Sequence, residues 1–182
     1  KNIDKDELII PKIILYSIVN DVELLLLDWI DMQDGDHKML GKGLGKMHLK
    51  SAETNQKKFG YAIDGYIGLT NQNKGWTDDW VDCFINLRIK PQLSILKDNL
   101  LDNKTKNQII KKISSELAHH KPSRALVHGD LWSGNIGINK EGKGVLFDPA
   151  SWWADNEVDI AMTKLFGGFK KEFYEEYNKV IP

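Results

Sequence analysis

The stretch His128-Gly-Asp-Leu-Trp-Ser-Gly-Asn135, followed by Val145-Leu-Phe-Asp148, decides how this chain is interpreted. It places an asparagine five positions after Asp130, and it ends an apolar strand on an aspartate 18 positions after Asp130. A glycine between the two stretches predicts a hairpin turn, and a hairpin of this length can return the second strand beside the loop. We therefore expect Asp130, Asn135 and Asp148 to converge.

Two carboxylates and an amide in this arrangement are typical of phosphoryl transfer. Asp130 would accept or orient the proton of an attacking hydroxyl, while Asn135 and Asp148 offer the hard oxygen ligands that Mg²⁺ prefers. The alternative is a turn in which an aspartate only caps backbone amides. The combined spacing, with a hairpin between the two stretches, favours the catalytic interpretation.

These motifs resemble those of the fructosamine (ketosamine) 3-kinases, a branch of the aminoglycoside-phosphotransferase and choline-kinase-like group with a protein-kinase-like fold. The resemblance spans most of the chain. It is carried further by Phe147-Asp-Pro-Ala150, Glu157-Val-Asp-Ile-Ala-Met162 and Leu165-Phe-Gly-Gly-Phe169. The pattern H-G-D-x-x-x-x-N belongs to the whole group, whereas the Leu-Trp-Ser-Gly insert within it is much narrower.

The resemblance implies that Asp130 is the catalytic base and that Asn135 and Asp148 are the metal ligands. It places Asp28-Trp29-Ile30 at the hinge, where backbone groups would bind the adenine of ATP. Asp159 would then brace the catalytic loop as structural support.

Four further residues are expected around this centre. His128 would orient the catalytic loop, with proton shuttling as the alternative. Trp132 would form a flat wall for the sugar, or else pack the lobe as a core aromatic. Glu157 or Asp155 would meet the amine of a ketosamine, although Glu157 could instead merely occupy the first turn of a helix.

The predicted fold is α+β and protein-kinase-like. Residues 1–30 would be the remnant of an N-terminal β lobe, namely its last hairpin and the hinge, and residues 31–182 a mainly helical C-terminal lobe. Leu24–Leu27 is apolar on both faces, so the second strand of the hairpin is expected to be central and covered. Residues 51–76 are expected to be loop-rich. Helices are expected over about 36–49, 104–119, 156–166 and 170–180, and short strands over 125–127, 135–139 and 144–147.

Three local motifs give further expectations. Thr77 is expected to cap a helix that Pro91 bends or ends. Gly41-Lys-Gly-Leu-Gly-Lys46 lacks the Gly-Lys-Ser/Thr of a P-loop, so its glycines are expected to permit close helix packing. His119 and His120 suit the negative end of a helix dipole better than a metal, because no third ligand is near them in sequence.

Composition limits the expected partners and compartment of the protein. The net charge of −1 offers no basic face for nucleic acid, and 41% hydrophobic with 28% charged residues is typical of a soluble globular protein. The apolar stretches are too short to span a membrane, the charged N-terminus is no signal peptide, and a single cysteine favours the cytoplasm. The expected partners are ATP, Mg²⁺ and a small-molecule or protein-bound ketosamine.

The predicted function is an ATP-dependent kinase that transfers the γ-phosphate to the 3-hydroxyl of a ketosamine such as fructosamine or ribulosamine. Two alternatives stay open: a kinase for another amino-sugar or amino-alcohol, and a kinase-derived module without catalysis. The sequence shows no Gly-rich loop, strand lysine or partnering helix glutamate before the hinge. We therefore expect a fragment whose 182 residues alone are inactive.

Overall fold

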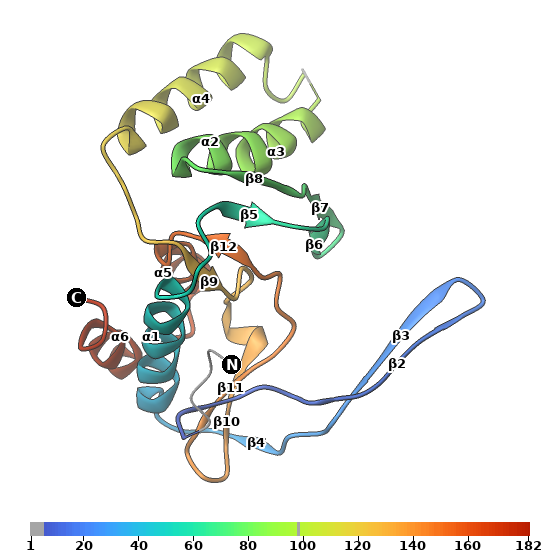
Figure 1. The fold of residues 1–182 in the computed structure, drawn as a ribbon, viewed down its shortest axis with the longest axis vertical. Coiled ribbons are helices and arrows are strands. Elements are labelled where there is room, and N and C mark those ends of the chain that lie inside the picture. Colours follow the sequence, from blue (N-terminus) through green and yellow to red (C-terminus); the bar gives the residue numbers. More distant parts are fainter. Residues whose placement is uncertain (1–5, 98) are drawn as a thin grey trace. The chain divides into compact units, whose positions relative to one another are not determined.

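The structure, a computed structural model, describes residues 6–97 and 99–182. The chain divides into two compact units that are interleaved in sequence, and each contains both sheet and helix (Figure 1). Unit 1 comprises Lys1–Lys50, Asp130–Pro149 and Ile160–Pro182, and unit 2 comprises Ser51–Gly129 and Ala150–Asp159. This division differs from the predicted lobe boundary at residue 30, which stays a prediction. No helix in the described part of the chain is long and apolar enough to cross a membrane.

Unit 1 contains a four-stranded sheet with the order β1-β11-β10-β4. Antiparallel β10 and β11 form the predicted hairpin, with Ile136 opposite Leu146. Strand β1 pairs parallel with β11, and β4 pairs antiparallel with β10. The strands are β1 (Leu8–Ile9), β4 (Met32–Gln33), β10 (Ile136–Asn139) and β11 (Gly144–Leu146).

Three helices belong wholly or mostly to unit 1. They are α1 (Lys38–Ala52), α5 (Glu157–Phe166) and α6 (Lys171–Asn178). Leu40, Leu44, Leu131 and Phe173 are fully buried in the core that α1 and α6 share with the sheet. A Cβ atom on Gly41 would collide with the carbonyl of Phe173. The prediction that the α1 glycines permit close packing is therefore confirmed.

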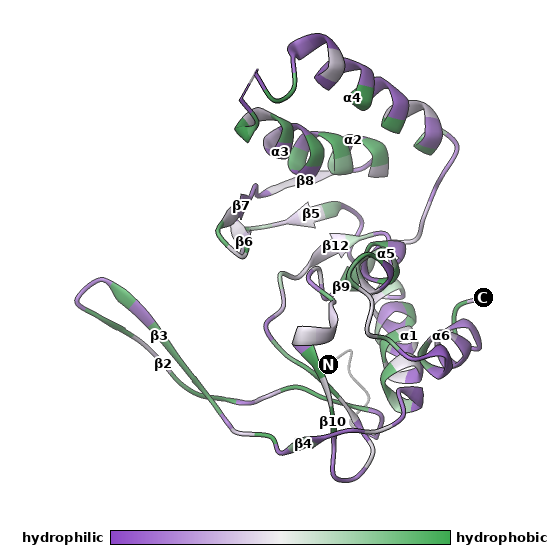
Figure 2. Ribbon diagram, turned by 180° about the vertical axis from the view of Figure 1, so that it is seen from behind, coloured by the Kyte–Doolittle hydropathy of each residue, from purple (hydrophilic) through white to green (hydrophobic). Residues whose placement is uncertain are grey.

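The hairpin of β2 (Ile13–Val19) and β3 (Val22–Leu27) contradicts one expectation. It is a separate two-stranded sheet, and every residue of β3 is exposed, including Leu25 at 58%. Both views show the hairpin projecting from the β4–β10 region of unit 1, and Figure 2 shows its apolar colouring. The prediction that β3 is central and covered is wrong for the described chain, because none of its elements pairs with the open edge of β3.

Unit 2 is organised around an antiparallel sheet with the order β8-β5-β12-β9. Trp80 lies at the centre of its core, with ring centroids 5.7 Å from Trp152 and 5.4 Å from Phe59. Residues 51–76, expected to be loop-rich, therefore hold real strands that are too short for a clear alternation. The strands are β5 (Phe59–Tyr61), β8 (Gly75–Thr77), β9 (Ala125–Val127) and β12 (Trp152–Ala154), with β6 (Gly65–Ile67) and β7 (Thr70–Gln72) as a separate hairpin.

The helices of unit 2 correct two predictions. Asp79, not Thr77, caps α2 (Trp80–Phe84), because its side chain accepts a hydrogen bond from the Asp82 amide at 3.1 Å. Of the two outcomes expected at Pro91, a bend or an end, only the end is contradicted, because the helix continues through a π-helical turn (Ile85–Ile89) into α3 (Lys90–Ile95). Pro91 has no N–H to offer the Leu87 carbonyl, and the Arg88 guanidinium donates to that carbonyl instead, at 2.8 Å. Helix α4 (Asn103–Leu117) forms where it was expected.

Candidate active site

Unit 1 brings together the three residues that the sequence singled out. The Asn135 side-chain amide donates to the Asp130 carbonyl at 2.9 Å, to the Asp130 carboxylate at 3.2 Å and to the Asp148 carbonyl at 3.4 Å. Asn135 is only 5% exposed, so these bonds form away from competing water. The expected convergence is observed, whereas the chemical roles of the three residues stay predictions.

The local sequence explains why this loop holds its shape. Leu131 is fully buried in the core of unit 1 and anchors the loop directly after Asp130. A 3₁₀ turn over Ser133–Asn135 follows, closed by a bond from the Asn135 amide to the Trp132 carbonyl at 3.0 Å. This turn directs the Asn135 side chain back toward Asp130.

Asp148 has an unusual backbone conformation. Its φ of +54° lies in the left-handed region, which aspartate tolerates better than most residues but which still costs free energy. Such outliers cluster at ligand-binding and catalytic positions. The Asn135 side-chain nitrogen already donates a hydrogen bond to the Asp130 carbonyl. The exposed Asp148 carboxylate and the buried Asn135 amide could therefore bind a metal ion only through oxygen atoms. This donor set fits Mg²⁺.

A buried carboxylate in unit 2 holds the backbone that directly precedes Asp130 in sequence. The two carboxylate oxygens of the fully buried Asp159 accept hydrogen bonds from the backbone amides of His128, at 2.7 Å, and Gly129, at 2.9 Å. Gly129 has φ +84°, and a Cβ atom there would collide with the carbonyl of Ala150. The geometry thus suits the bracing role expected of Asp159. His128 is 4% exposed, and this burial favours orientation over proton shuttling.

The predicted substrate residues Asp155 and Glu157 lie with His120 in unit 2. One ligand atom from each of the three residues lies within 4.8 Å of the others. Two carboxylates that are distant in sequence therefore lie near His120 in space, although no further metal ligand is near it in sequence. Asp155 is 4% exposed and Glu157 lies in the first turn of α5. The amine-binding role of both residues stays a prediction.

Trp132 is both accessible to solvent and packed against its neighbours. The ring is 40% exposed, so a substrate could reach it. It also packs over Gly134, and its centroid lies 6.2 Å from that of Phe166. The role of Trp132 as a wall for the sugar stays a prediction.

The predicted hinge, Asp28–Ile30, connects the β2–β3 hairpin to β4. The Asp28 amide donates to the Lys12 carbonyl at 3.0 Å, and the Lys12 amide donates to the Asp28 carboxylate. The Trp29 side chain is 87% exposed. Backbone groups other than the Asp28 amide would therefore have to meet adenine.

A pocket of about 550 Å³ in unit 1 lies between the segment that follows the hinge and the catalytic loop. Residues 32–35, Ser133 and Ile136 line it, together with His37 and Lys170. Sequence reasoning missed His37 and Lys170, because neither stands in a recognisable motif. The Lys170 amide donates to His37 Nδ1 at 3.3 Å. Burial, and then the positive charge of Lys170, lower the pKa of His37.

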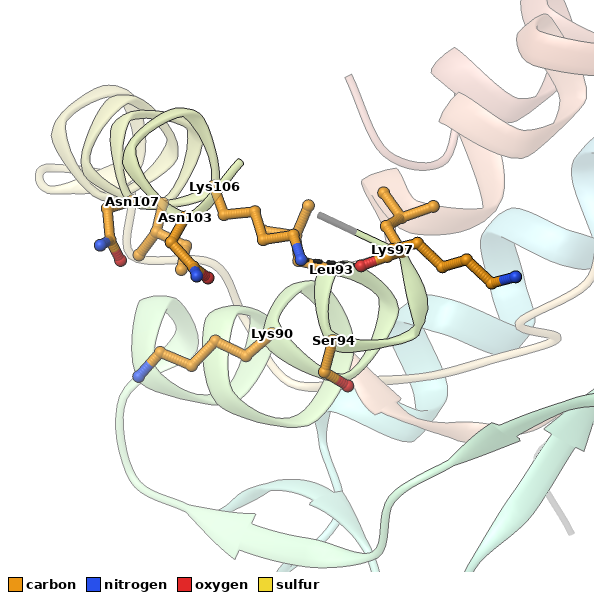
Figure 3. Close-up of a pocket in the computed structure, with 9 residues that line it drawn as sticks. Lys90, Leu93, Ser94, Lys97, Asn103, Lys106 and Asn107 are labelled. Carbon is orange, nitrogen blue, oxygen red and sulfur yellow. Dashed lines mark hydrogen bonds between the residues drawn. The ribbon is translucent and has the colours of Figure 1, made fainter. Parts of the chain in front are cut away.

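A second pocket, of about 540 Å³, lies between α3 and α4 of unit 2 (Figure 3). Its lysines do not converge on one point: Lys106 donates to the Leu96 carbonyl at 2.7 Å, and Lys90 donates to the Asn86 side chain at 2.8 Å. None of the predicted site residues lines it.

Comparison with known proteins shows similarity to one family of kinases. A family model described as fructosamine kinase matches residues 2–182. A "Probable ketoamine kinase" of Synechocystis sp. is 35% identical over 176 residues, which cover 95% of this chain and 59% of the relative. A protein of the same description from Vibrio parahaemolyticus is 35% identical over 177 residues, covering 95% of this chain and 60% of the relative.

Solved structures are similar as well. A "Putative fructosamine-3-kinase" from Haemophilus somnus matches with a TM-score of 0.86 at 26% identity, over 97% of this chain and 60% of the other. One from Thermobifida fusca matches with a TM-score of 0.77 at 29% identity, over 94% and 59%. The chain thus spans about 60% of the length of the relatives it matches. With the family model covering residues 2–182, the chain belongs to the fructosamine kinase family.

Proposed function

We propose that this chain carries the catalytic and metal-binding part of an ATP-dependent kinase that phosphorylates the 3-hydroxyl of a ketosamine such as fructosamine or ribulosamine. The convergence of Asp130, Asn135 and Asp148 supports this proposal most directly. The relatives' descriptions as ketoamine kinase and fructosamine-3-kinase support the reaction class and the substrate.

Asp130 would act as the base. Its carboxylate takes the proton of the substrate hydroxyl as the oxygen bonds to the γ-phosphorus and the bond to the β-phosphate oxygen breaks. The Asn135 amide donates to that carboxylate and so holds one of its oxygens in place. Asp159 fixes the two backbone amides that precede Asp130, so the base is positioned from both sides.

Asp148 and Asn135 would hold Mg²⁺ through oxygen atoms. When bound, this ion would neutralise charge on the phosphate oxygens. Asp148 is exposed, so a nucleotide could reach its carboxylate.

The nucleotide would lie against the hinge. The 550 Å³ pocket begins two residues after Ile30 and reaches Ser133 of the catalytic loop, which suits a ligand that extends from the hinge toward Asp130. Trp132 and Glu157 are the proposed contacts to the sugar and amine of the substrate. The lone, buried Cys83 agrees with a cytoplasmic protein.

The hairpin supports the proposed division at residue 30. Its apolar side chains are exposed on both faces, as expected of a sheet that another β layer completes. The relatives are longer than this chain. We propose that residues 1–30 belong to a phosphate-gripping β lobe and that residues 1–182 alone do not transfer phosphate.

The test uses the complete gene product with Mg·ATP and five acceptors at equal concentration: ribulose-lysine, fructose-lysine, free fructose, choline and an aminoglycoside. We expect both ketosamines to be preferred. Asp130→Asn should lower kcat by about 10²–10⁴, as expected for the loss of a positioned base, with little change in the KM for ATP.

Asn135→Asp, which keeps an oxygen ligand but removes the amide donor, is the matched comparison for Asp130→Asn. Wild-type turnover in Asp130→Asn would contradict the assignment of the base. Faster phosphorylation of choline or the aminoglycoside would contradict the proposed substrate.

A further inference from the structure

The group of His120, Asp155 and Glu157 lies outside the three converging residues and is organised by hydrogen bonds. His120 Nε2 lies 2.5 Å from one carboxylate oxygen of Asp155. The other oxygen of Asp155 accepts the Glu157 amide at 3.0 Å. Both oxygens of this buried carboxylate are therefore already used, and the group functions as an anchor more readily than as an ion site.

The anchor fixes the beginning of α5. The Asp155 side chain caps the helix at Glu157, while its carbonyl accepts the Val158 amide at 3.1 Å. The Asp159 amide bonds the Asn156 carbonyl in the same turn, at 3.2 Å. Any shift of this turn moves Asp159, whose carboxylate holds the amides of His128 and Gly129.

We propose that His120 is a positioning residue for the catalytic loop. Through Asp155 it fixes the first turn of α5, and through Asp159 that turn fixes the His128–Gly129 backbone that leads into Asp130. The catalytic consequence rests on the proposed function, whereas the structural link from His120 to Gly129 does not. Asp155 thereby acquires a structural role in place of the predicted substrate contact.

The groups around His120 and Asp155 indicate that no other side chain among the described residues would replace the imidazole as the donor to Asp155. Without the imidazole, one oxygen of the 4% exposed Asp155 carboxylate would lose its donor, which is costly for a buried charged group. Glu157 offers only a second negative charge. Lys121 is next in sequence, but it pairs with Asp79 at 2.9 Å. The Asp155 carboxylate would therefore turn toward water and away from the Glu157 amide.

Three variants separate the links. His120→Ala removes the imidazole and leaves no side-chain donor for Asp155, and Asp155→Ser keeps an oxygen that can cap α5 but cannot pair with His120. His119→Ala is the matched control, because His119 is the exposed neighbour of His120. Amide hydrogen exchange of Gly129 is measured by NMR on the 182-residue chain in EDTA, relative to exchange of the Cys83 amide in α2 of the same unit.

We expect His120→Ala and Asp155→Ser to accelerate Gly129 exchange, relative to Cys83, by about tenfold or more, and to shift the Gly129 amide resonance. His119→Ala should change the exchange ratio less than about twofold. An unchanged Gly129 exchange ratio in both test variants would overturn the proposal. Without EDTA, an equimolar Zn²⁺-dependent shift of the His120 resonances would also overturn it, in favour of a metal site.

The second readout is kinetic and uses the complete gene product. His120→Ala should lower kcat about tenfold at an unchanged KM for Mg·ATP, with His119→Ala at the wild-type value. If the wild-type protein transfers no phosphate, the proposed function fails while the exchange result still stands. If exchange is unchanged while the wild-type protein is active, the positioning proposal alone fails.

Discussion

The segment Asp130–Asp148, which holds the proposed catalytic residues, and the β2–β3 hairpin belong to the same unit, yet their apolar residues are in opposite environments. Leu131 and Leu146 are 0% and 3% exposed, whereas Leu25 and Leu26 in β3 are 58% and 53% exposed. The catalytic loop takes its shape from the core of its own unit. The hairpin contributes almost nothing to that core, and its apolar surface indicates a contact that the described residues do not supply.

The largest expected effect would sharpen this contrast. Leu131→Ala should lower the free energy of unfolding of the chain by about 2–5 kcal/mol, because it empties a fully buried site. Leu25→Ala, the matched exposed leucine, should change it by about 0.5 kcal/mol or less. Urea unfolding of both variants measures the difference.

The same pair in the complete gene product tests the proposed β lobe. There, Leu25→Ala should become clearly destabilising, since another layer would cover the hairpin. A cost for Leu25→Ala as small as in the 182-residue chain would contradict the proposed lobe.

A smaller effect is expected at Asp148. Asp148→Gly and Asp148→Ala both remove the proposed metal ligand, so both should lose Mg²⁺-dependent ADP binding in calorimetric titration of the complete gene product. They should differ in stability, with the glycine variant more stable by about 1 kcal/mol, because glycine adopts a φ of +54° without strain. Equal stability of the two variants would show that the backbone relaxes, and unchanged Mg·ADP affinity would place the ion elsewhere.

The smallest expected effect concerns His37, in the pocket that residues of the segment Asp130–Asp148 line together with residues 32–35. Burial lowers the pKa of His37 below its usual 6.5, so the folded chain binds fewer protons there than the unfolded chain. The stability from this group is present above about pH 6.5 and is lost as the pH falls toward the lowered pKa.

The melting temperature should therefore fall from pH 7.5 to pH 5.5 by slightly less in His37→Asn than in the wild type. His119→Asn, at an exposed position, should follow the wild type. A pH dependence of His37→Asn identical to that of the wild type would show that His37 does not contribute.

The sequence predicted the convergence at Asn135 because hairpin length and the positions of polar residues are local properties. It could not predict that β3 is exposed. An apolar run indicates that a strand favours burial on both faces, but it does not show whether the described residues contain a segment that buries it. Three-residue strands such as β5 and β12 carry too little alternation to be recognised. The pair of His120 and Asp155 joins residues 35 positions apart, and no spacing rule connects them.

Helix α1 has a consequence for how the chain folds. Gly41, Gly43 and Gly45 let α6 and β1 approach closely, but together they cost the isolated helix about 2–3 kcal/mol relative to alanine. A peptide of residues 38–52 should therefore show little helical signal by circular dichroism. Helix α1 would then form only as its partners dock, so the local segment cannot act as an early nucleus, and the folding rate would depend on contacts between residues far apart in the chain.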